Sequence, residues 1–401
     1  MIIHLYLNDN DRKCPHCSST NVYKKDTTIK KLYHPYSNDR KCIIYFHHFK
    51  FKCNDCNKTF LQKNDIVCSG KCISLPGTLN ILHKLRNYKT TFQDVSEFYH
   101  IPKMDVINCF DNHVDINRHS LTKVICLDEF YSKNLTKTKY CFTIYDPFNK
   151  TVLDVVDSRR KEALEDYFSH ISIEERQLVY FVNIDMWQTY KEISNIYLPN
   201  ATVCVDSFHV IKHLNSALDQ IRKKIQRNFK NEKNDSRKTS WYWLLSTFKY
   251  YLLSDMDNVK YVRQPHSHFS YLWTKWEVLE ALLSTSEGLR EAYKLKEEYR
   301  EFNKTATYEI ALEKLPIYID KFKKNRYSEF REFGKMLERW FPEVVNSFII
   351  VDGKRMSNGP IESLNSRVRR IIDNGFGFSN FSRFRNKIMY SLNKDEPIKF
   401  R

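Results

Sequence analysis

The sequence predicts a multidomain α/β protein, and three observations carry this prediction. Seven of the eleven cysteines lie near the N-terminus, within a segment that ends close to residue 74. Apolar residues then recur at helical spacing over residues 75–119. Strand-like runs alternate with helical ones over residues 120–214. This order predicts a cysteine-rich domain over residues 1–74, a helical domain after it, and a larger mixed α/β domain beyond.

Two CxxC motifs in the first domain predict a zinc ribbon. They are Cys14-Pro-His-Cys17 and Cys53-Asn-Asp-Cys56, and strand-forming side chains fill residues 22–52 between them. Four thiolates bind Zn²⁺ in a tetrahedral arrangement. A redox CxxC is the alternative, but that motif normally opens a helix after a strand, so structural Zn²⁺ is the favoured prediction.

Further cysteines carry weaker signals. Cys68 and Cys72 form a CxxxC pair that could contribute a second metal site, so their role stays open. The later cysteines stand in apolar contexts, which is typical of small core residues.

Residues 75–119 predict a helix-turn-helix. Thr91 precedes the short amphipathic run FQDVSEFYH, and a second helix is expected from about Lys103 to His113, after a break at Pro102. In a helix-turn-helix this second helix would enter the major groove of DNA, although an ordinary three-helix linker fits the pattern about as well. The candidates for DNA contact in this part of the chain are Lys84, Arg86, Lys89 and Lys103.

The next segment predicts a ribonuclease-H-like fold. VICLDEF, KYCFTIYD and TVLDVVD are expected to form three strands of a meander, and two more strands, LVYFVNID and ATVCVDSF, are expected to alternate with helices. About 150 residues after the last of these strands are expected to be helical throughout. The predicted catalytic domain therefore covers residues 120–214 and 351–392, and residues 215–350 form an all-α insertion.

Two aspartates close or interrupt apolar runs. Asp128 interrupts VICLDEF and Asp185 closes LVYFVNID. Burying a carboxylate costs several kcal/mol unless a cation or hydrogen bonds offset the cost, and a metal ion is a natural partner. A helix N-cap for Asp185 and an edge position for Asp128 are the alternatives. Asp146, Asp154 and Asp157 are possible substitutes if the strand register differs, whereas Glu129 is expected on the opposite face.

A third carboxylate, Glu362, lies in the first turn of a predicted helix in SNGPIESLNSRVRRI. Simple capping is the alternative. Four of the eight glycines crowd around this helix, where the backbone must turn tightly or approach a ligand. Its outer side carries Arg367, Arg369 and Arg370, which suggests an acid directed at metal and arginines directed at phosphate.

Taken in order, LDEF, NIDMWQTY, VDSFHVIKHLN, SNGPIESLNSRVRRI and GFGFSNFSRFRNKI resemble the DDE transposases of bacterial insertion sequences, specifically the ISL3 family. The final family motif has a glycine where this chain has Ser363 and an asparagine where it has Ser366. Neither departure touches the acid. Asp206 and His209 form a DxxH that resembles an auxiliary signature of several transposase groups, so His209 could contact the scissile phosphate. Packing at a strand-to-helix junction is an equal alternative for this histidine.

The resemblance implies an enzyme of DNA transposition and recombination. Asp128, Asp185 and Glu362 would bind two Mg²⁺ or Mn²⁺ ions for phosphodiester hydrolysis and strand transfer. The expected partners are double-stranded DNA, as transposon ends and target, and a second copy of the chain in a dimer or larger complex. A zinc-ribbon and helix-turn-helix regulator with an inactive nuclease-like domain is the competing hypothesis.

Composition fits a DNA partner. Lys and Arg total 65 against 48 for Asp and Glu, so the formal net charge is +17, although biased composition alone could produce it. The chain has no run of 18 apolar residues and no evident signal-peptide core. We therefore expect no membrane partner and a cytoplasmic, nucleoid-associated protein.

Overall fold

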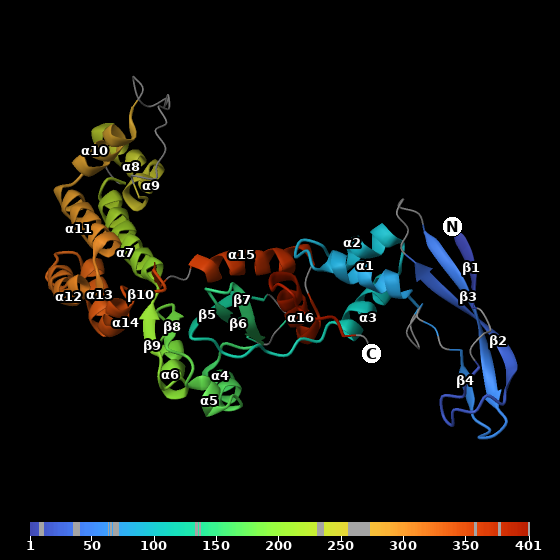
Figure 1. Ribbon diagram of the computed structural model, residues 1–401. Coiled ribbons are helices and arrows are strands. Elements are labelled where there is room, and N and C mark those ends of the chain that lie inside the picture. The colour runs from blue at the N-terminus through green and yellow to red at the C-terminus, as the bar shows by residue number, and fades with distance from the viewer. Residues whose placement is uncertain are drawn as a thin grey trace. The chain divides into compact units, whose positions relative to one another are not determined.

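The computed structural model describes residues 1–7, 12–34, 41–62, 64, 66, 72–132, 135, 138–230, 236–255, 273–356, 359–375 and 378–399. Figure 1 labels the helices and strands. The motif residues Cys68, Ser357, Asn358 and Gly377 lie outside this description. The chain divides into two compact units. The first holds Met1–Leu121, Asp128–Leu164 and Pro360–Arg401, and the second holds Thr122–Leu127 and Glu165–Gly359.

The first unit begins with a four-stranded sheet. Its strands are β1 (Ile2–Tyr6), β2 (Val22–His34), β3 (Cys42–Cys53) and β4 (Thr59–Leu61). The central strand β3 pairs in parallel with β1 and antiparallel with β2 and β4. The strand β1 was not predicted, because its partner lies about 40 residues further along the chain and leaves no local signal.

Alternation along β3 creates two different faces of this sheet. Cys42, Ile44 and Phe46 are buried while the residues between them are half-buried, as expected for side chains that point to opposite faces. The buried face forms a small core from Leu32, Ile44 and Phe46, against which residues of β1 pack.

Three helices follow the sheet, namely α1 (Leu75–Leu85), α2 (Phe92–Tyr99) and α3 (Lys103–His113). Ser74 caps α1, and Thr91 forms a capping box with Asp94 at the start of α2. His100 ends α2 in the left-handed region with φ 52°. The predicted helix from Lys103 to His113 is confirmed by the bounds of α3.

The C-terminal helix α16 (Phe381–Leu392) packs against α1 in the same unit. The buried Lys387 ammonium donates to the carbonyl oxygens of Leu85 and Asn87 at the end of α1. Tyr390 donates to Leu82 O at 3.2 Å. Burial lowers the pKa of Lys387 to about 7, because the charged form is poorly solvated there.

A second sheet has the strand order β7-β6-β5-β8-β9. Its strands are β5 (Val124–Tyr131), β6 (Tyr140–Asp146), β7 (Thr151–Val156), β8 (Phe181–Ile184) and β9 (Thr202–Val205). In the first unit β6 and β7 are antiparallel. In the second unit the start of β5 pairs in parallel with β8, and β8 pairs in parallel with β9. The strands predicted from the sequence are all present, and the mixed α/β class is confirmed.

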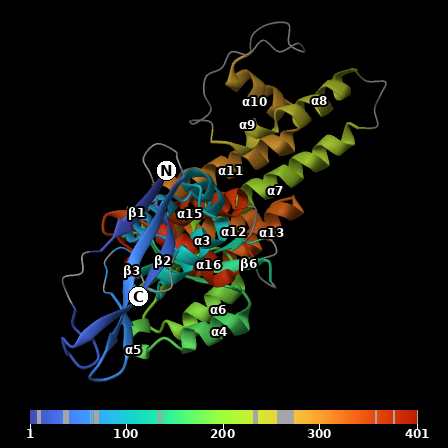
Figure 2. The same cartoon turned by 90° about the vertical axis from the view of Figure 1, so that its right-hand side faces the viewer.

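Helices connect and extend this sheet. The connecting helices are α4 (Lys161–Ser169), α5 (Ile173–Arg176) and α6 (Gln188–Tyr197). In the second unit, α7 (Ser207–Asn228) begins directly after β9 and packs against α11 and α13 (Figure 2). The remaining helices of this unit are α8 (Ser236–Thr247), α9 (Lys249–Leu253), α10 (Lys275–Ser284), α11 (Glu287–Thr305), α12 (Tyr308–Lys323), α13 (Ser328–Arg339) and α14 (Phe341–Asn346).

A β-hairpin interrupts the predicted run of helices. The strands β10 (Ile350–Val351) and β11 (Lys354–Arg355) pair antiparallel. Asp352 and Gly353 join them with φ values of 48° and 74°, as a tight hairpin turn requires. The prediction of helix throughout is therefore wrong here, and the Asp-Gly pair was the missed signal. Helix α15 (Gly359–Asn374) follows in the first unit from Pro360 onward.

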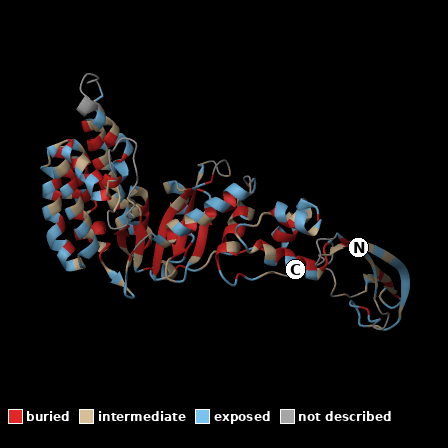
Figure 3. Cartoon of the chain, turned by 90° about the horizontal axis from the view of Figure 1, so that it is seen from above, coloured by how far each residue is buried: buried red, intermediate tan, exposed pale blue. Residues whose placement is uncertain are grey.

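Buried residues follow the strands and one side of most helices (Figure 3). In α15 these are Ile361, Leu364, Val368, Ile371 and Ile372, which recur at the spacing of one helix face. Among the described helices, none combines the length and apolar character needed to cross a lipid bilayer.

Candidate functional site

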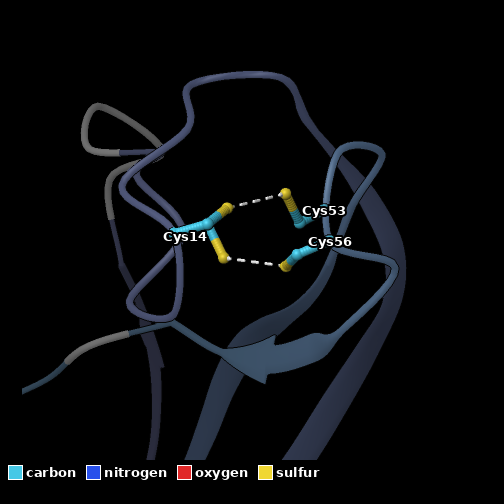
Figure 4. A group of neighbouring side chains, drawn as sticks. Cys14, Cys53 and Cys56 are labelled. Carbon is cyan, nitrogen blue, oxygen red and sulfur yellow. Dashed lines mark hydrogen bonds between the residues drawn. The ribbon is translucent and has the colours of Figure 1, made fainter.

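Four thiols converge at one end of the N-terminal sheet. The Cys14 and Cys56 sulfurs lie 3.6 Å apart, as do those of Cys17 and Cys53, and all four sulfurs lie within 4.8 Å of one another. Figure 4 shows Cys14, Cys53 and Cys56 of this cluster. A tetrahedron with metal–sulfur bonds of 2.3 Å has edges of about 3.8 Å, so the spacing fits a Zn²⁺ site. It is too long for disulfides.

The sequence around the thiols makes two matching turns. Ser18 and Asn57 each follow the second cysteine of a CxxC motif, and both adopt the left-handed region, with φ 60° and 57°. Val22, the first residue of β2, pairs with Cys53, the last residue of β3, and this pairing brings the two turns together. Burial opposes ionisation of Cys14, but the backbone N–H groups of His16 and Cys17 lower its pKa to about 7. The Ser19 N–H favours the thiolate of Cys17, but burial and the neighbouring thiols raise the pKa of Cys17, so Cys14 forms the metal-binding thiolate more readily. The Cys₄ cluster thus suggests structural zinc.

A second group of candidate ligands lies where the parallel pairing of β5 with β8 ends. In the second unit Leu127 pairs with Ile184, and Asp128 and Asp185 directly follow these two paired residues. Polar groups just beyond parallel strands of an α/β sheet are where such folds commonly bind ligands. The N-cap position of α6 is Trp187, two residues after Asp185.

The DxxH motif occupies the neighbouring strand end in the second unit. Ile184 pairs with Val205, and Asp206 N donates to Ile184 O at 3.0 Å. Asp206 is the N-cap of α7 and accepts from Phe208 N at 3.4 Å. His209 lies in the first turn of that helix, where its N–H donates to Asp206 O at 3.1 Å. Asp206 therefore caps the N-terminus of α7. The side chain of His209 is half-buried.

In the first unit, helix α15 contacts Asp128. The Asn365 amide donates to Asp128 Oδ2 at 2.7 Å, and Glu129 N donates to Asp128 Oδ1 at 2.8 Å. Glu362 lies three residues before Asn365, so both side chains project from the same side of α15. Sequence reasoning missed Asn365, although its spacing from Glu362 was the available signal.

Glu129, which was not expected among the metal ligands, and two of the three substitute carboxylates have partners of their own. Glu129 accepts from Arg159 at 2.6 Å, and Asp154 accepts from Arg385 at 2.6 Å. Asp146 accepts from the backbone N–H groups of Phe148 and Asn149 and so shapes the turn after β6. Asp157 is exposed.

The predicted DNA-contacting residues fall into two groups. Lys89, Lys103, Arg369 and Arg370 are exposed in the first unit, and Arg370 donates to Tyr88 OH at 3.4 Å. The others are half-buried. Among these, Lys84 Nζ lies 3.0 Å from the centre of the Phe98 ring.

Arg86 and Arg367 complete the half-buried group. The guanidinium of Arg86 stacks 4.6 Å from the centre of the Tyr390 ring and donates to Glu396 O. It therefore ties α1 to the C-terminal segment. Arg367 lies on α15, one helical turn beyond Ser363.

Comparison with known proteins identifies the family of this chain. No curated protein matches the chain. The model of the ISL3 transposase family, described as a transposase, matches residues 125–388, which is more than half of the 401 residues and includes all three predicted catalytic carboxylates. With both aspartates and the acidic helix in the matched region, the chain belongs to the ISL3 family of DDE transposases.

Proposed function

We propose that this transposase binds the terminal inverted repeats of its insertion sequence and catalyses metal-dependent cleavage and strand transfer of DNA. The family implies DNA as the partner. The parallel register of β5 and β8 carries the catalytic part of the proposal, because Asp128 and Asp185 each follow a residue of the same pair, Leu127 and Ile184.

The proposed metal ligands are Asp128, Asp185 and Glu362. Carboxylate oxygens suit Mg²⁺ or Mn²⁺. Two such ions, when bound, would activate water for in-line attack and stabilise the leaving 3′ oxygen. The contact from Asn365 to Asp128 supports a role for α15 at this centre, because it links the helix that carries Glu362 to the strand that carries Asp128.

The other residues have binding roles in the proposal. Arg367, Arg369 and Arg370 on α15 would hold phosphates, for which the forked guanidinium is suited. His209, one turn into α7, would contact the scissile phosphate. The DNA backbone would be contacted by Lys84, Lys89 and Lys103, beside a helix-turn-helix formed by α2 and α3. Arg86 would help to hold the C-terminal segment against α1.

We further propose a ribonuclease-H-like catalytic domain over residues 120–214 and 351–392, with an all-α insertion over residues 215–350. The strand order β7-β6-β5-β8-β9 supports it, since an antiparallel hairpin precedes parallel strands linked by helices. The zinc ribbon over residues 1–74 and the helix-turn-helix over residues 75–119 would recognise the ends. Joining two ends requires at least two copies, and the proposed location is the cytoplasm, on the nucleoid.

Cleavage of the flanking DNA tests the proposal. Wild type and Asp185→Asn are incubated with Mg²⁺ and DNA that carries the sequences bordering the gene. Asp166→Asn, which changes an exposed carboxylate of the same unit, is the matched control. We expect cuts at the repeat boundary with wild type and Asp166→Asn and none with Asp185→Asn. Specific binding without cleavage by any of the three would favour a DNA-binding regulator instead.

A further inference from the structure

The outer face of the N-terminal sheet carries a row of aromatic and histidine rings. Tyr45 stacks on His4 with ring centres 5.3 Å apart, His4 lies 5.3 Å from His47, and His47 stacks on Tyr6 at 4.2 Å. The His4 Nδ1 and His47 Nε2 atoms lie 3.0 Å apart, within hydrogen-bonding distance. We call these four residues the ring row. It alternates between the neighbouring strands β1 and β3 (Figure 1).

The ring row lies on the face opposite the core. Its strand neighbours Ile3, Ile44 and Phe46 belong to the core cluster, so alternation sends the rings to the other side. Tyr6 is 66% exposed, and its one ring contact among the described residues is with His47. One end of the row is therefore open to an added ring. Exposed aromatic side chains that gather on one face of a sheet are candidates for a binding site.

The charge of the sheet indicates what binds there. Its four strands hold one acid, Asp26, and six lysines, namely Lys24, Lys25, Lys30, Lys31, Lys50 and Lys52. Two of these lysines project from the face of the ring row, because Lys31 pairs with Tyr45 and Lys24 with Phe51, whereas the acid Asp26 pairs with Lys50 on the other face. A second copy of the sheet placed on the ring row would therefore bring lysines against lysines. A polyanion gains from the same charges. The Lys24 ammonium lies 3.6 Å from the centre of the Phe49 ring, so charge and rings occupy the same sheet.

We propose that the ring row is a stacking platform for the bases of single-stranded DNA, with the open side of Tyr6 taking an unpaired base. Proteins that bind single strands combine basic surfaces with aromatic rings on which bases stack. Unpaired bases are needed because the base faces within a duplex are already stacked on one another. The inference rests on the proposed function only in taking DNA as the partner, and it assigns the sheet a role separate from the cleavage site.

Binding of the full-length, zinc-loaded protein to a labelled oligothymidylate of about ten nucleotides tests this role. We expect Tyr6→Ala to lower the affinity by about fivefold or more, since one stacking contact is lost, and Tyr6→Phe to restore it. Tyr180→Ala is the matched control, because Tyr180 is a tyrosine of the second unit that is 47% exposed. The zinc content of each variant, measured in parallel, reports whether the sheet remains folded.

Photocrosslinking locates the contact. An oligonucleotide that carries 5-iodouracil should crosslink to peptides containing Tyr6 or Tyr45. Wild-type affinity in Tyr6→Ala together with crosslinks confined to other segments would overturn the proposal. A lower sedimentation coefficient in Tyr6→Ala, with unchanged oligonucleotide affinity, would also overturn it and would identify the face as an interface between copies.

The cleavage assay keeps this inference separate from the proposed function. Asp185→Asn should bind the oligothymidylate as the wild type does. If the wild type cuts no DNA but loses oligonucleotide affinity on Tyr6→Ala, the proposed function fails and the stacking platform stands. If cleavage occurs and Tyr6→Ala has no effect on oligonucleotide binding, the stacking platform fails and the proposed function stands.

Discussion

The cysteine cluster and the carboxylates differ in how far apart along the chain their candidate ligands lie. The cysteines run from Cys14 to Cys56, and two turns of one sheet bring them together. The carboxylates run from Asp128 to Glu362 and depend on strand register and on the packing of α15. A locally assembled site has little core of its own and needs its metal to fold, whereas a site on a packed sheet should keep its shape without metal.

Zinc removal is the prediction with the largest expected effect. Cys56→Ser should reduce zinc below one ion per chain and unfold the N-terminal sheet, because structural Zn²⁺ supplies on the order of 10 kcal/mol to such small domains. Zinc analysis would measure the metal content, and limited proteolysis within residues 1–62 would measure the unfolding of the sheet. Cys72→Ser, which changes an exposed cysteine, should retain zinc. A stable sheet in zinc-free Cys56→Ser would show that the cysteine site does not need its metal to fold.

Removal of a carboxylate should act on catalysis alone. Glu362→Gln should slow cleavage by roughly 10²–10³-fold or more, since it removes charge stabilisation in the reacting site. The melting temperature and zinc content should not change. Single-turnover kinetics measure the cleavage rate. The control is Glu313→Gln, which changes an exposed glutamate of α12. A collapse of stability in Glu362→Gln would mean that this acid is structural.

Asn365 should position Asp128. Asn365→Ala removes a hydrogen bond to a carboxylate, which is worth about 1.5–3 kcal/mol, and so should slow cleavage roughly 10- to 100-fold. Because the effect acts through the orientation of Asp128, the Mg²⁺ concentration needed for half-maximal cleavage should rise. Ser366→Ala changes the exposed neighbouring residue on α15 and should leave both quantities unchanged. An unaltered Mg²⁺ dependence in Asn365→Ala would count against positioning.

Lys387 tests the helix packing of the first unit through a gradual change of stability with pH. Its pKa is about 7 in the folded chain and about 10.4 when unfolded. The unfolded chain therefore binds more protons between these values, so the free energy of unfolding should rise with pH, by at most about 1.4 kcal/mol per pH unit. Below pH 7 the full cost of burying the charge remains.

Denaturant unfolding from pH 7 to pH 9.5 measures this rise. Lys387→Met should flatten it, and Lys394→Met, at an exposed lysine, should not. Equal slopes for the wild type and Lys387→Met would show that the ammonium is solvated in the folded chain.

Local patterns predicted the cysteine site and much of the fold. The CxxC spacing identified all four thiols, and capping residues such as Thr91 marked helix starts. Non-local pairing was less accessible, because β1 finds its partner in β3 without a turn between them. Apolar runs that an acid closes or interrupts identified Asp128 and Asp185 as candidates. The contact of Asn365 with Asp128 depends on how α15 packs, which no pattern in the sequence reports.

The helix α7 links the sheet to the helical segment without a loop. It starts at Ser207, beside the DxxH motif, and continues through residues 214 and 215, where the insertion was predicted to begin. Each residue of a helix advances the chain by about 100°. Deleting one residue within α7 would therefore rotate everything beyond it, while deleting seven would nearly restore the original phase. Chimeras that exchange this segment between relatives must conserve that helical phase as well as the segment itself.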